Sequence, residues 1–482
     1  MAIVTSKFRV SAASGFTSTF ASDSIYLVLG RPQPWDNTIS TKFTTQANGT
    51  VSDNNPPNPV DNYANEYAFW RDAMAGIRLN ASDVKLATVR NNWQSGTRYD
   101  MYQHNITSSN PSSTGKFDLS DTNMIVYVTS TGAVYKCLYN GRNGSSTTGT
   151  VSTVLPTTTG TAPQKTADGY IWKYLYTITA SDADFVTANY IPVPANNTSI
   201  SNVNGIDVIY VTSAGGGYSG TPTVDIYGDG TGATATAVTS SGVITRIDVT
   251  NAGSGYTWAK IVFNGGGTPT TANAIAVMSP SGGHGSNLGA ECMAHHVMIA
   301  GTVTGYEQND FPVNQDFRTV GLVKNPLTYN SSVGYTVTGT GTVHTANTGR
   351  ILRTLTMTSG ATIAPTNDIV ITGSNSQASG LSVFQSSGTT RLEYIQPVQS
   401  DDPETISNLR IDTTGTKNLY QFTTGETITG TGYSQVVNSS TGITGTLPEI
   451  HPYTGQLLYL DYRQPVTRAA GQNEKINIVI NF

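Results

Sequence analysis

The chain has 482 residues, of which only 12% are charged, and 49 are glycine. Its net charge of −5, without a dense Lys/Arg patch beside aromatic residues, argues against a nucleic-acid-binding protein. No apolar run reaches the roughly 18 residues that a membrane helix needs, and no apolar segment follows Lys7 and Arg9 as it would in a signal peptide, so we expect no membrane partner.

The first hundred residues contain one predicted strand and one predicted helix. An apolar run over Ile25–Leu29 predicts a buried strand. Residues 61–76 favour a helix, because Asp61 or Asn62 can cap its N-terminus and Gly76 can end it. The larger side chains of this helix recur at helical spacing, at Tyr63, Tyr67, Trp70 and Met74.

The following segment has the alternating pattern of strands. Strands are predicted at 124–128 and 134–139, and a longer strand at Asp168–Ile178 is followed by a short helix. One face of the long strand is aromatic, with Tyr170, Trp172, Tyr174 and Tyr176. Such a face can stack on sugars, but it is more often part of a core or an interface.

Residues 203–279 contain an internal repeat. The segment Val211–Tyr218 (VTSAGGGY) aligns with Val249–Tyr256 (VTNAGSGY), which gives a period of 38 residues, from 211 to 249. Each copy predicts a strand, a Gly-rich turn with a tyrosine, a second strand and an Ala/Thr-rich third strand. Two copies of one β unit indicate a small β domain, which interrupts the rest of the pattern as an insertion.

The last third of the chain is again rich in predicted strands. A turn of helix and a strand are expected at 282–301, another strand at Phe317–Leu327, and a second all-β insertion at 331–447, where Thr and Gly alternate. Leu457–Tyr462 predicts a further strand.

The terminal strand has the clearest alternation. Ile476, Ile478, Ile480 and Phe482 share one face and are expected to be buried, whereas Asn477 and Asn481 lie on the other. We expect this strand to pair with Leu457–Tyr462, through a loop at Arg463–Lys475, and with Ile25–Leu29. The two ends of the chain would then close one domain.

These elements predict an α+β, predominantly β, multidomain protein. The expected domains are a core α+β domain of 1–100 with 281–330 and 448–482, a β domain of 101–202, an inserted β-repeat domain of 203–280, and an inserted all-β domain of 331–447.

Several stretches carry a resemblance to a known family and occur in one order. They are Ala2–Arg9 (AIVTSKFR), Gly30–Trp35 (GRPQPW), Trp93 with Gly96–Tyr99 (GTRY), Asp168–Tyr176 (DGYIWKYLY), Phe317–Leu327 (FRTVGLVKNPL), and the terminal GQLLYLDYRQP and QNEKINIVINF. In this order the chain resembles the gene-eight baseplate wedge protein family of T-even-type contractile-tailed bacteriophages. The resemblance covers residues 1–200, 280–330 and 448–482, and both insertions lie outside it.

The resemblance implies a structural protein of the virion, located in the tail baseplate and assembled in the host cytoplasm. Family members look like homodimers that bind neighbouring wedge proteins, and the sheath contracts when the baseplate changes shape. The resemblance implies neither an enzyme activity nor a cofactor. Because the cytoplasm keeps thiols reduced, we expect Cys137 and Cys292 to be free rather than bonded to each other.

One group of residues could suggest a metal site. His284, Cys292, His295 and His296 lie close together in the sequence. A structural zinc site needs four tetrahedral ligands, whereas adjacent histidines on a strand point to opposite faces. We therefore interpret His295 and His296 as one surface and one core histidine, and we predict no metal ligand.

A second group resembles a cofactor motif. Gly215, Gly217 and Gly220 have the spacing of a dinucleotide-binding fingerprint. That motif needs a following helix whose N-terminus holds the pyrophosphate. Here Pro222 and a predicted strand follow, so we predict no cofactor-binding residue.

Two other functions remain open. A receptor-binding tail adhesin is favoured by the Gly/Thr-rich insertions, which could contact the host surface. A tail depolymerase would need paired carboxylates held on rigid walls. Asp401, Asp402 and Glu404 cluster in a polar loop, where a solvated turn is the simpler interpretation, and we predict no catalytic residue.

Overall fold

The computed structural model describes residues 3–35, 51–142, 148–200, 205–304, 310–329, 341–360, 369–385, 389–395, 409–411, 417–419, 422–442, 447–469 and 471–482. Antiparallel sheets dominate these residues, which confirms the predicted predominance of β structure. None of the helices within these ranges is long and apolar enough to cross a membrane. The chain divides into two compact units: unit 1 comprises Met1–Thr17, Val84–Ala300 and Asn477–Phe482, and unit 2 comprises Ser18–Asp83 and Gly301–Ile476.

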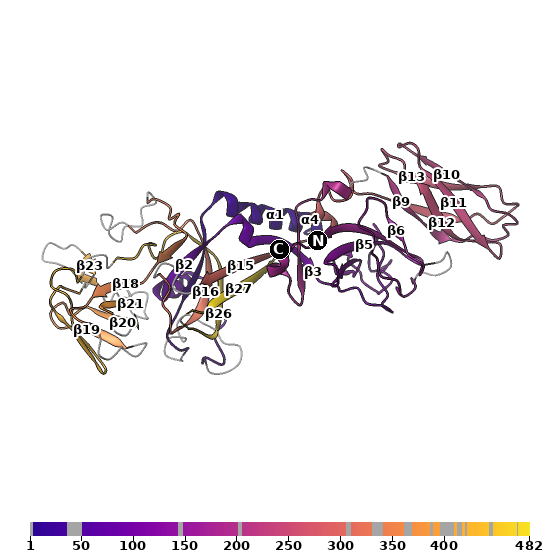
Figure 1. Ribbon diagram of the computed structural model, residues 1–482. Coiled ribbons are helices and arrows are strands. Elements are labelled where there is room, and N and C mark those ends of the chain that lie inside the picture. Colours follow the sequence, from indigo (N-terminus) through magenta and orange to yellow (C-terminus); the bar gives the residue numbers. More distant parts are fainter. Residues whose placement is uncertain are drawn as a thin grey trace. The chain divides into compact units, whose positions relative to one another are not determined.

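Two four-stranded sheets form much of unit 1 (Figure 1). One has the order β27 (Asn473–Asn481), β15 (His296–Thr304), β3 (Val84–Val89) and β8 (Tyr190–Val193). The other has the order β4 (Ile125–Val128), β5 (Ala133–Asn140), β7 (Tyr170–Thr177) and β6 (Gln164–Lys165). Among the described residues, the helices of unit 1 are the first part of α1 (Ser6–Ser22), α4 (Leu288–Glu291) and the 3₁₀ helices η2 (Leu119–Asp121), η3 (Ala180–Phe185) and η4 (Thr198–Ile200).

The aromatic face of β7 lies in the core of unit 1. Tyr170 and Trp172 are fully buried and stack with ring centroids 5.2 Å apart. Trp172 also meets Tyr99 edge to face at 5.6 Å, and the Tyr99 N–H donates to the Tyr170 hydroxyl at 3.2 Å. Two of the stretches that carry the family resemblance, GTRY and DGYIWKYLY, therefore form one packed cluster. Leu175 on the opposite face is buried as well, so β7 is covered on both sides.

The two copies of the repeat each supply three strands to one six-stranded sheet in unit 1. The first copy forms β9 (Ile206–Ser213), β10 (Thr223–Gly228) and β11 (Thr234–Ser240), and the second forms β12 (Val243–Asn251), β13 (Ala259–Asn264) and β14 (Asn273–Met278). The strand order is β13–β10–β11–β12–β9–β14 (Figure 1).

The tyrosines of the two repeat turns have equivalent partners. The Ala272 N–H donates to the Tyr218 hydroxyl at 3.1 Å, and the Ala233 N–H donates to the Tyr256 hydroxyl at 3.4 Å. Each tyrosine of one copy is thus bonded to the backbone of the other copy. The exchange of these bonds ties the two copies into one sheet and explains why the tyrosine recurs in the sequence repeat.

Unit 2 contains a five-stranded sheet and a six-stranded sheet. The first has the order β17 (Thr348–Arg350), β2 (Ala73–Leu79), β1 (Ile25–Gly30), β16 (Gln315–Lys324) and β26 (Gln456–Arg468). The second has the order β18 (Arg353–Thr356), β21 (Arg391–Ile395), β20 (Ser379–Phe384), β19 (Val370–Gly373), β24 (Thr427–Gly430) and β25 (Tyr433–Val436), and β22 (Leu409–Ile411) pairs separately with β23 (Lys417–Leu419). The predicted strand at Ile25–Leu29 is confirmed as β1, and every residue of it is buried.

Three resemblance stretches meet around Trp35 in unit 2. The Trp35 indole N–H donates to the Arg463 carbonyl at 2.8 Å, and its ring packs on Tyr462 at 4.9 Å. Arg318 bonds Asp53 through both Nε (2.8 Å) and Nη2 (2.9 Å), and Asp53 in turn accepts the Trp35 N–H at 2.8 Å. GRPQPW, FRTVGLVKNPL and DYRQP are distant in sequence, but they form one local contact in space.

The predicted helix at 61–76 is only partly correct. Helix α3 (Tyr63–Arg71) begins as expected, and the Asn62 side chain accepts the Asn65 N–H. It ends at Arg71, however, and Gly76 lies inside β2, where it pairs with Val28 of β1. The segment Ala73–Leu79 (AMAGIRL) is buried by pairing with β1, and this pairing outweighs the helical spacing of the large side chains. Helix α1 was not predicted, because its Ser, Ala and Thr residues give no strong apolar face.

The terminal strand forms as predicted, but its expected partners were wrong. Ile476 and Ile478 are buried, and Asn477 and Asn481 are exposed, whereas Ile480 and Phe482 are only half-buried. β27 lies beside β15 rather than beside β26 or β1. The expected loop at Arg463–Lys475 was also wrong, because β26 continues to Arg468 by pairing with β16.

Candidate functional site

A buried cluster of charged side chains lies in unit 1 between the loop after β14 and strands β9 and β5. His284 is 1% exposed, and its Nε2 lies 2.7 Å from Asp207 Oδ2. Its Nδ1 contacts Glu291 Oε1, which also lies 3.4 Å from the Lys136 Nζ. We call Asp207, His284, Glu291 and Lys136 the His284 cluster.

The backbone around His284 is shaped by glycine. Gly285 has a φ of +78°, and a Cβ at this position would lie 2.1 Å from the Asn197 carbonyl oxygen. The Gly285 N–H donates to Glu291 Oε2 at 3.0 Å, and the Asn197 N–H donates to the Gly285 carbonyl at 2.7 Å. Only glycine fits this left-handed, closely packed position without strain. The loop therefore presents His284 to two carboxylates that come from β9 and from the end of α4.

The cluster shifts the pKa values of its members in directions that favour charge pairing. Burial opposes ionisation of Glu291, but Lys136 and His284 outweigh it and lower the pKa of Glu291 to about 2. Burial would likewise lower the pKa of His284, but its hydrogen bonds to Asp207 and Glu291, with the charge of both, raise it. Burial lowers the pKa of Lys173 in β7, and the negative charges of Asp207 and Glu291 partly oppose this shift. The arrangement is an ionic link between the repeat sheet and the body of unit 1.

The metal candidates do not come together. His284 faces Asp207 and Glu291 rather than Cys292, and no group of three potential ligands forms among the residues that the structure describes. The expectation that His295 and His296 point to opposite faces was wrong, because their ring centroids are 4.3 Å apart. β15 begins only at His296, so strand alternation does not apply to His295. Burial lowers the pKa of His296 to about 4.

The glycines of the possible cofactor motif lie in a turn between strands. Gly215 and Gly217 have left-handed φ values of +63° and +79°, and strand β10 rather than a helix follows them. They serve the turn that holds Tyr218. Asp401, Asp402 and Glu404 lie outside the described residues.

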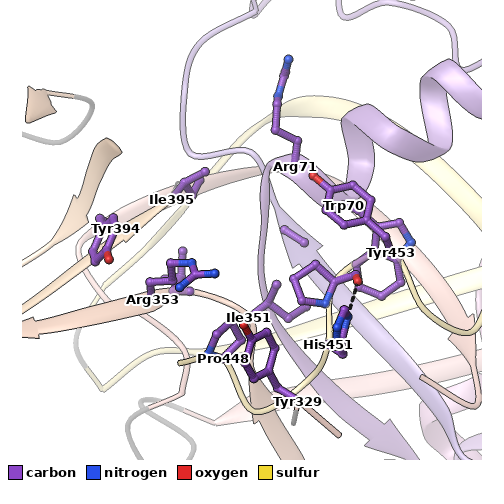
Figure 2. A pocket seen from close by; sticks show the side chains of 13 residues that line it. Trp70, Arg71, Tyr329, Ile351, Arg353, Tyr394, Ile395, Pro448, His451 and Tyr453 are labelled. Carbon is purple, nitrogen blue, oxygen red and sulfur yellow. Dashed lines mark hydrogen bonds between the residues drawn. The ribbon is translucent and has the colours of Figure 1, made fainter. Parts of the chain in front are cut away.

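A hollow in unit 2 was not anticipated from the sequence. Figure 2 shows Trp70, Tyr329, His451 and Tyr453 around it, together with side chains from β18 and β21. Tyr329 stacks on His451 at 5.1 Å, and Tyr453 stacks on Tyr67 at 4.8 Å. Tyr453 has a φ of 62°, a left-handed conformation that is strained for a residue with a side chain. Trp70 is buried, whereas Tyr329 and Tyr453 are half-buried. Tyrosine is enriched among the residues that dominate the energetics of protein interfaces, so the accessible part of this wall suits contact with another protein.

Comparison with known proteins shows that the first part of this β-rich chain is similar to a family of phage baseplate proteins. The family is the one described as Bacteriophage T4, Gp8, and its model matches residues 2–205, which is less than half of the chain. This confirms the resemblance for the stretches that lie within residues 2–205. The curated proteins contain no match to the chain.

Proposed function

We propose that the chain is a homodimeric scaffold of the baseplate wedge. It binds neighbouring wedge proteins, resides in the tail of the virion after assembly in the host cytoplasm, and helps to transmit the baseplate change that triggers sheath contraction. The role is structural and involves no reaction. The observation that carries the proposal is the family match over residues 2–205.

The contacts of unit 2 support extending the role beyond the matched residues. Arg318 and Tyr462 lie outside 2–205, yet they pack against Trp35 and Asp53, which lie within it. The family-like stretches of the second half therefore complete a structure that the matched half begins.

Two features of unit 2 support binding to other proteins. β26 is the last strand in the order of its sheet, so one side of it has no strand partner among the described residues. An edge strand can pair with a strand of another chain. At the hollow, the half-buried Tyr329 and Tyr453 supply aromatic side chains of the kind that anchor protein interfaces.

Light scattering of the purified chain at micromolar concentration tests the dimer. The expected mass is about twice the 51.0 kDa of the chain. Co-purification with neighbouring wedge proteins of the same phage tests the scaffold role. Tyr329→Ala should weaken this co-purification, whereas Tyr63→Ala, at a residue that is 90% exposed on α3 and outside the hollow, should not. A monomer that retains no wedge protein would overturn the proposal.

A further inference from the structure

The outer face of the β10–β13 pair carries two exposed aromatic side chains. Tyr227 is 55% exposed and Trp258 is 53% exposed. Tyrosine and tryptophan bury large areas when they belong to a core. On the opposite face of these strands, Ile226 and Ile261 pack against the core of the repeat sheet. The exposed pair therefore does not contribute to that core.

The strand register and the bonds of Asp229 place the backbones of the two aromatic residues near one another, where β10 ends and β13 begins. Tyr227 pairs with Lys260, and Gly228 pairs with Ala259. Trp258 immediately precedes β13, and its N–H donates to the carboxylate of Asp229, which follows Tyr227 by two residues. The two exposed aromatic residues therefore occupy neighbouring positions in the β10–β13 pair.

The backbone that carries Trp258 is held in place. The Asp229 carboxylate accepts the N–H groups of Thr257 at 2.8 Å and Trp258 at 3.2 Å, and it also accepts the Thr257 hydroxyl. The Thr257 hydroxyl and N–H are the main reasons why the pKa of Asp229 is lowered to about 2. An exposed tryptophan on a fixed loop is a preorganised surface, which costs less entropy to bind than a mobile one.

Polar side chains surround the pair on the same face. Asn264 donates to the Asp225 carboxylate, and Lys260 is exposed beside Tyr227. Amide, carboxylate, ammonium and hydroxyl groups can bond the hydroxyls of a sugar, while its C–H face stacks on an aromatic ring. The centre of a protein–protein interface is depleted in charged residues, whereas here Asp225 and Lys260 stand next to the rings. The chemistry of this face favours a carbohydrate.

We propose that the outer face of β10–β13 is a binding site for a bacterial surface polysaccharide, with Tyr227 and Trp258 stacking on its sugar rings. Asp225, Lys260 and Asn264 bond the hydroxyls. This inference goes beyond the scaffold role and does not depend on it, since it concerns residues outside the family match. It gives the repeat sheet a direct contact with the host envelope.

The test uses the purified full chain on an array of bacterial O-antigen and capsular polysaccharides. The wild type should bind at least one polysaccharide, and Trp258→Ala and Tyr227→Ala should each weaken that binding roughly tenfold or more. Tyr63→Ala is the matched control, because Tyr63 is an exposed aromatic residue in unit 2 and should leave binding unchanged. All three variants should melt like the wild type, since none of the three side chains is buried.

Two results would overturn the site. One is a wild-type chain that binds none of the polysaccharides, and the other is binding that survives both substitutions at the aromatic pair. If Trp258→Ala instead loses co-purification with wedge proteins, the face is a protein contact and the carbohydrate site is wrong. Loss of the dimer or of wedge binding in the wild type would count only against the scaffold role.

Discussion

His284 Nε2 lies 2.7 Å from Asp207 Oδ2, and this contact fastens the loop that leaves the repeat sheet to the strand that enters it. Both side chains are buried, and Asp207 lies in β9 while His284 follows β14. Because Glu291 and Lys136 belong to the body of unit 1, the same cluster links the repeat sheet to its surroundings.

The stability of unit 1 should therefore depend on pH. The pKa of His284 is raised above 6.5, so its contribution is fully present below that pH and is lost as the pH rises through the higher folded value. The pKa of Glu291 is lowered from 4.5 to about 2, so its contribution is present above 4.5 and is lost as the pH falls towards 2. Thermal melting should therefore give the highest stability between about pH 4.5 and 6.5.

His284→Gln should flatten the alkaline side of this profile. Removing one partner of a buried ion pair costs about 3–5 kcal/mol, so we expect a loss of this order at pH 6, measured by urea unfolding. His104→Gln is the control, because His104 is exposed. An unchanged pH profile in His284→Gln would show that the cluster does not titrate.

The terminal strand should be sensitive on one face only. Ile478 is 4% exposed, so Ile478→Ala should lower the free energy of unfolding by about 2–5 kcal/mol. Asn481 is exposed, and Asn481→Ser should stay within about 0.5 kcal/mol of the wild type. Deletion of 476–482 should abolish soluble folding, because it removes both buried isoleucines and the pairing with β15. Soluble, cooperatively melting truncated protein would refute this expectation.

The repeat turn offers a test with a neighbouring control. Gly215 has a φ of +63°, and an added Cβ would lie 2.4 Å from the Thr270 carbonyl oxygen. Gly215→Ala should therefore destabilise the fold by about 1–3 kcal/mol or more. Gly216 has no atom within 4 Å of an added Cβ, so Gly216→Ala should be nearly neutral in the same urea titration. Equal effects of the two substitutions would contradict the strained turn.

Both thiols should be inaccessible in the native protein. Cys137 and Cys292 are free and buried, and burial raises the pKa of each thiol. An aromatic disulfide reagent at pH 8 should label neither cysteine in native protein and both in denatured, unreduced protein. Protection of both after denaturation would indicate a disulfide.

The inserted repeat should be separable. We propose that replacing 203–280 with a short Gly/Ser linker leaves the rest of the chain folded and dimeric. The variant should be less stable than the wild type, because Val208, Tyr210 and Val277 contribute to the core cluster of unit 1. Circular dichroism and light scattering decide the outcome, and complete loss of soluble protein would show that the repeat belongs to the core.

Local patterns in the sequence predicted most strands and the start of α3. β1, β4, β5, β7 and β27 form where alternation or apolar runs placed them, because burial acts on residues that are adjacent in sequence. Partners over long separations were not predictable: β27 joins β15, and β26 continues to Arg468 only because β16 lies beside it. The weakly amphipathic α1 gave no signal.

The His284 cluster was missed for a similar reason. Asp207, Lys136 and Glu291 come from three separate parts of the chain, and no spacing rule connects them to His284. A signal was nevertheless present. Asp207 in GIDVIYV and Lys136 in AVYKCLY are single charges inside apolar strands, and a charge in such a place needs a buried partner.

The pairing of β9 with β14 brings Ile206 opposite Met278, so the repeat sheet starts and finishes at neighbouring points. Because its two ends are adjacent, the whole sheet is inserted between flanking segments that a short loop could also connect. A longer connection between the same two points costs little additional chain entropy. Genetic exchange between phages could replace this stretch with another cassette whose ends also meet, provided that the cassette supplies the contacts that Asp207, Val208 and Val277 make with the body of unit 1. The binding preference of a tail could then change in one recombination event while the scaffold around it stays the same.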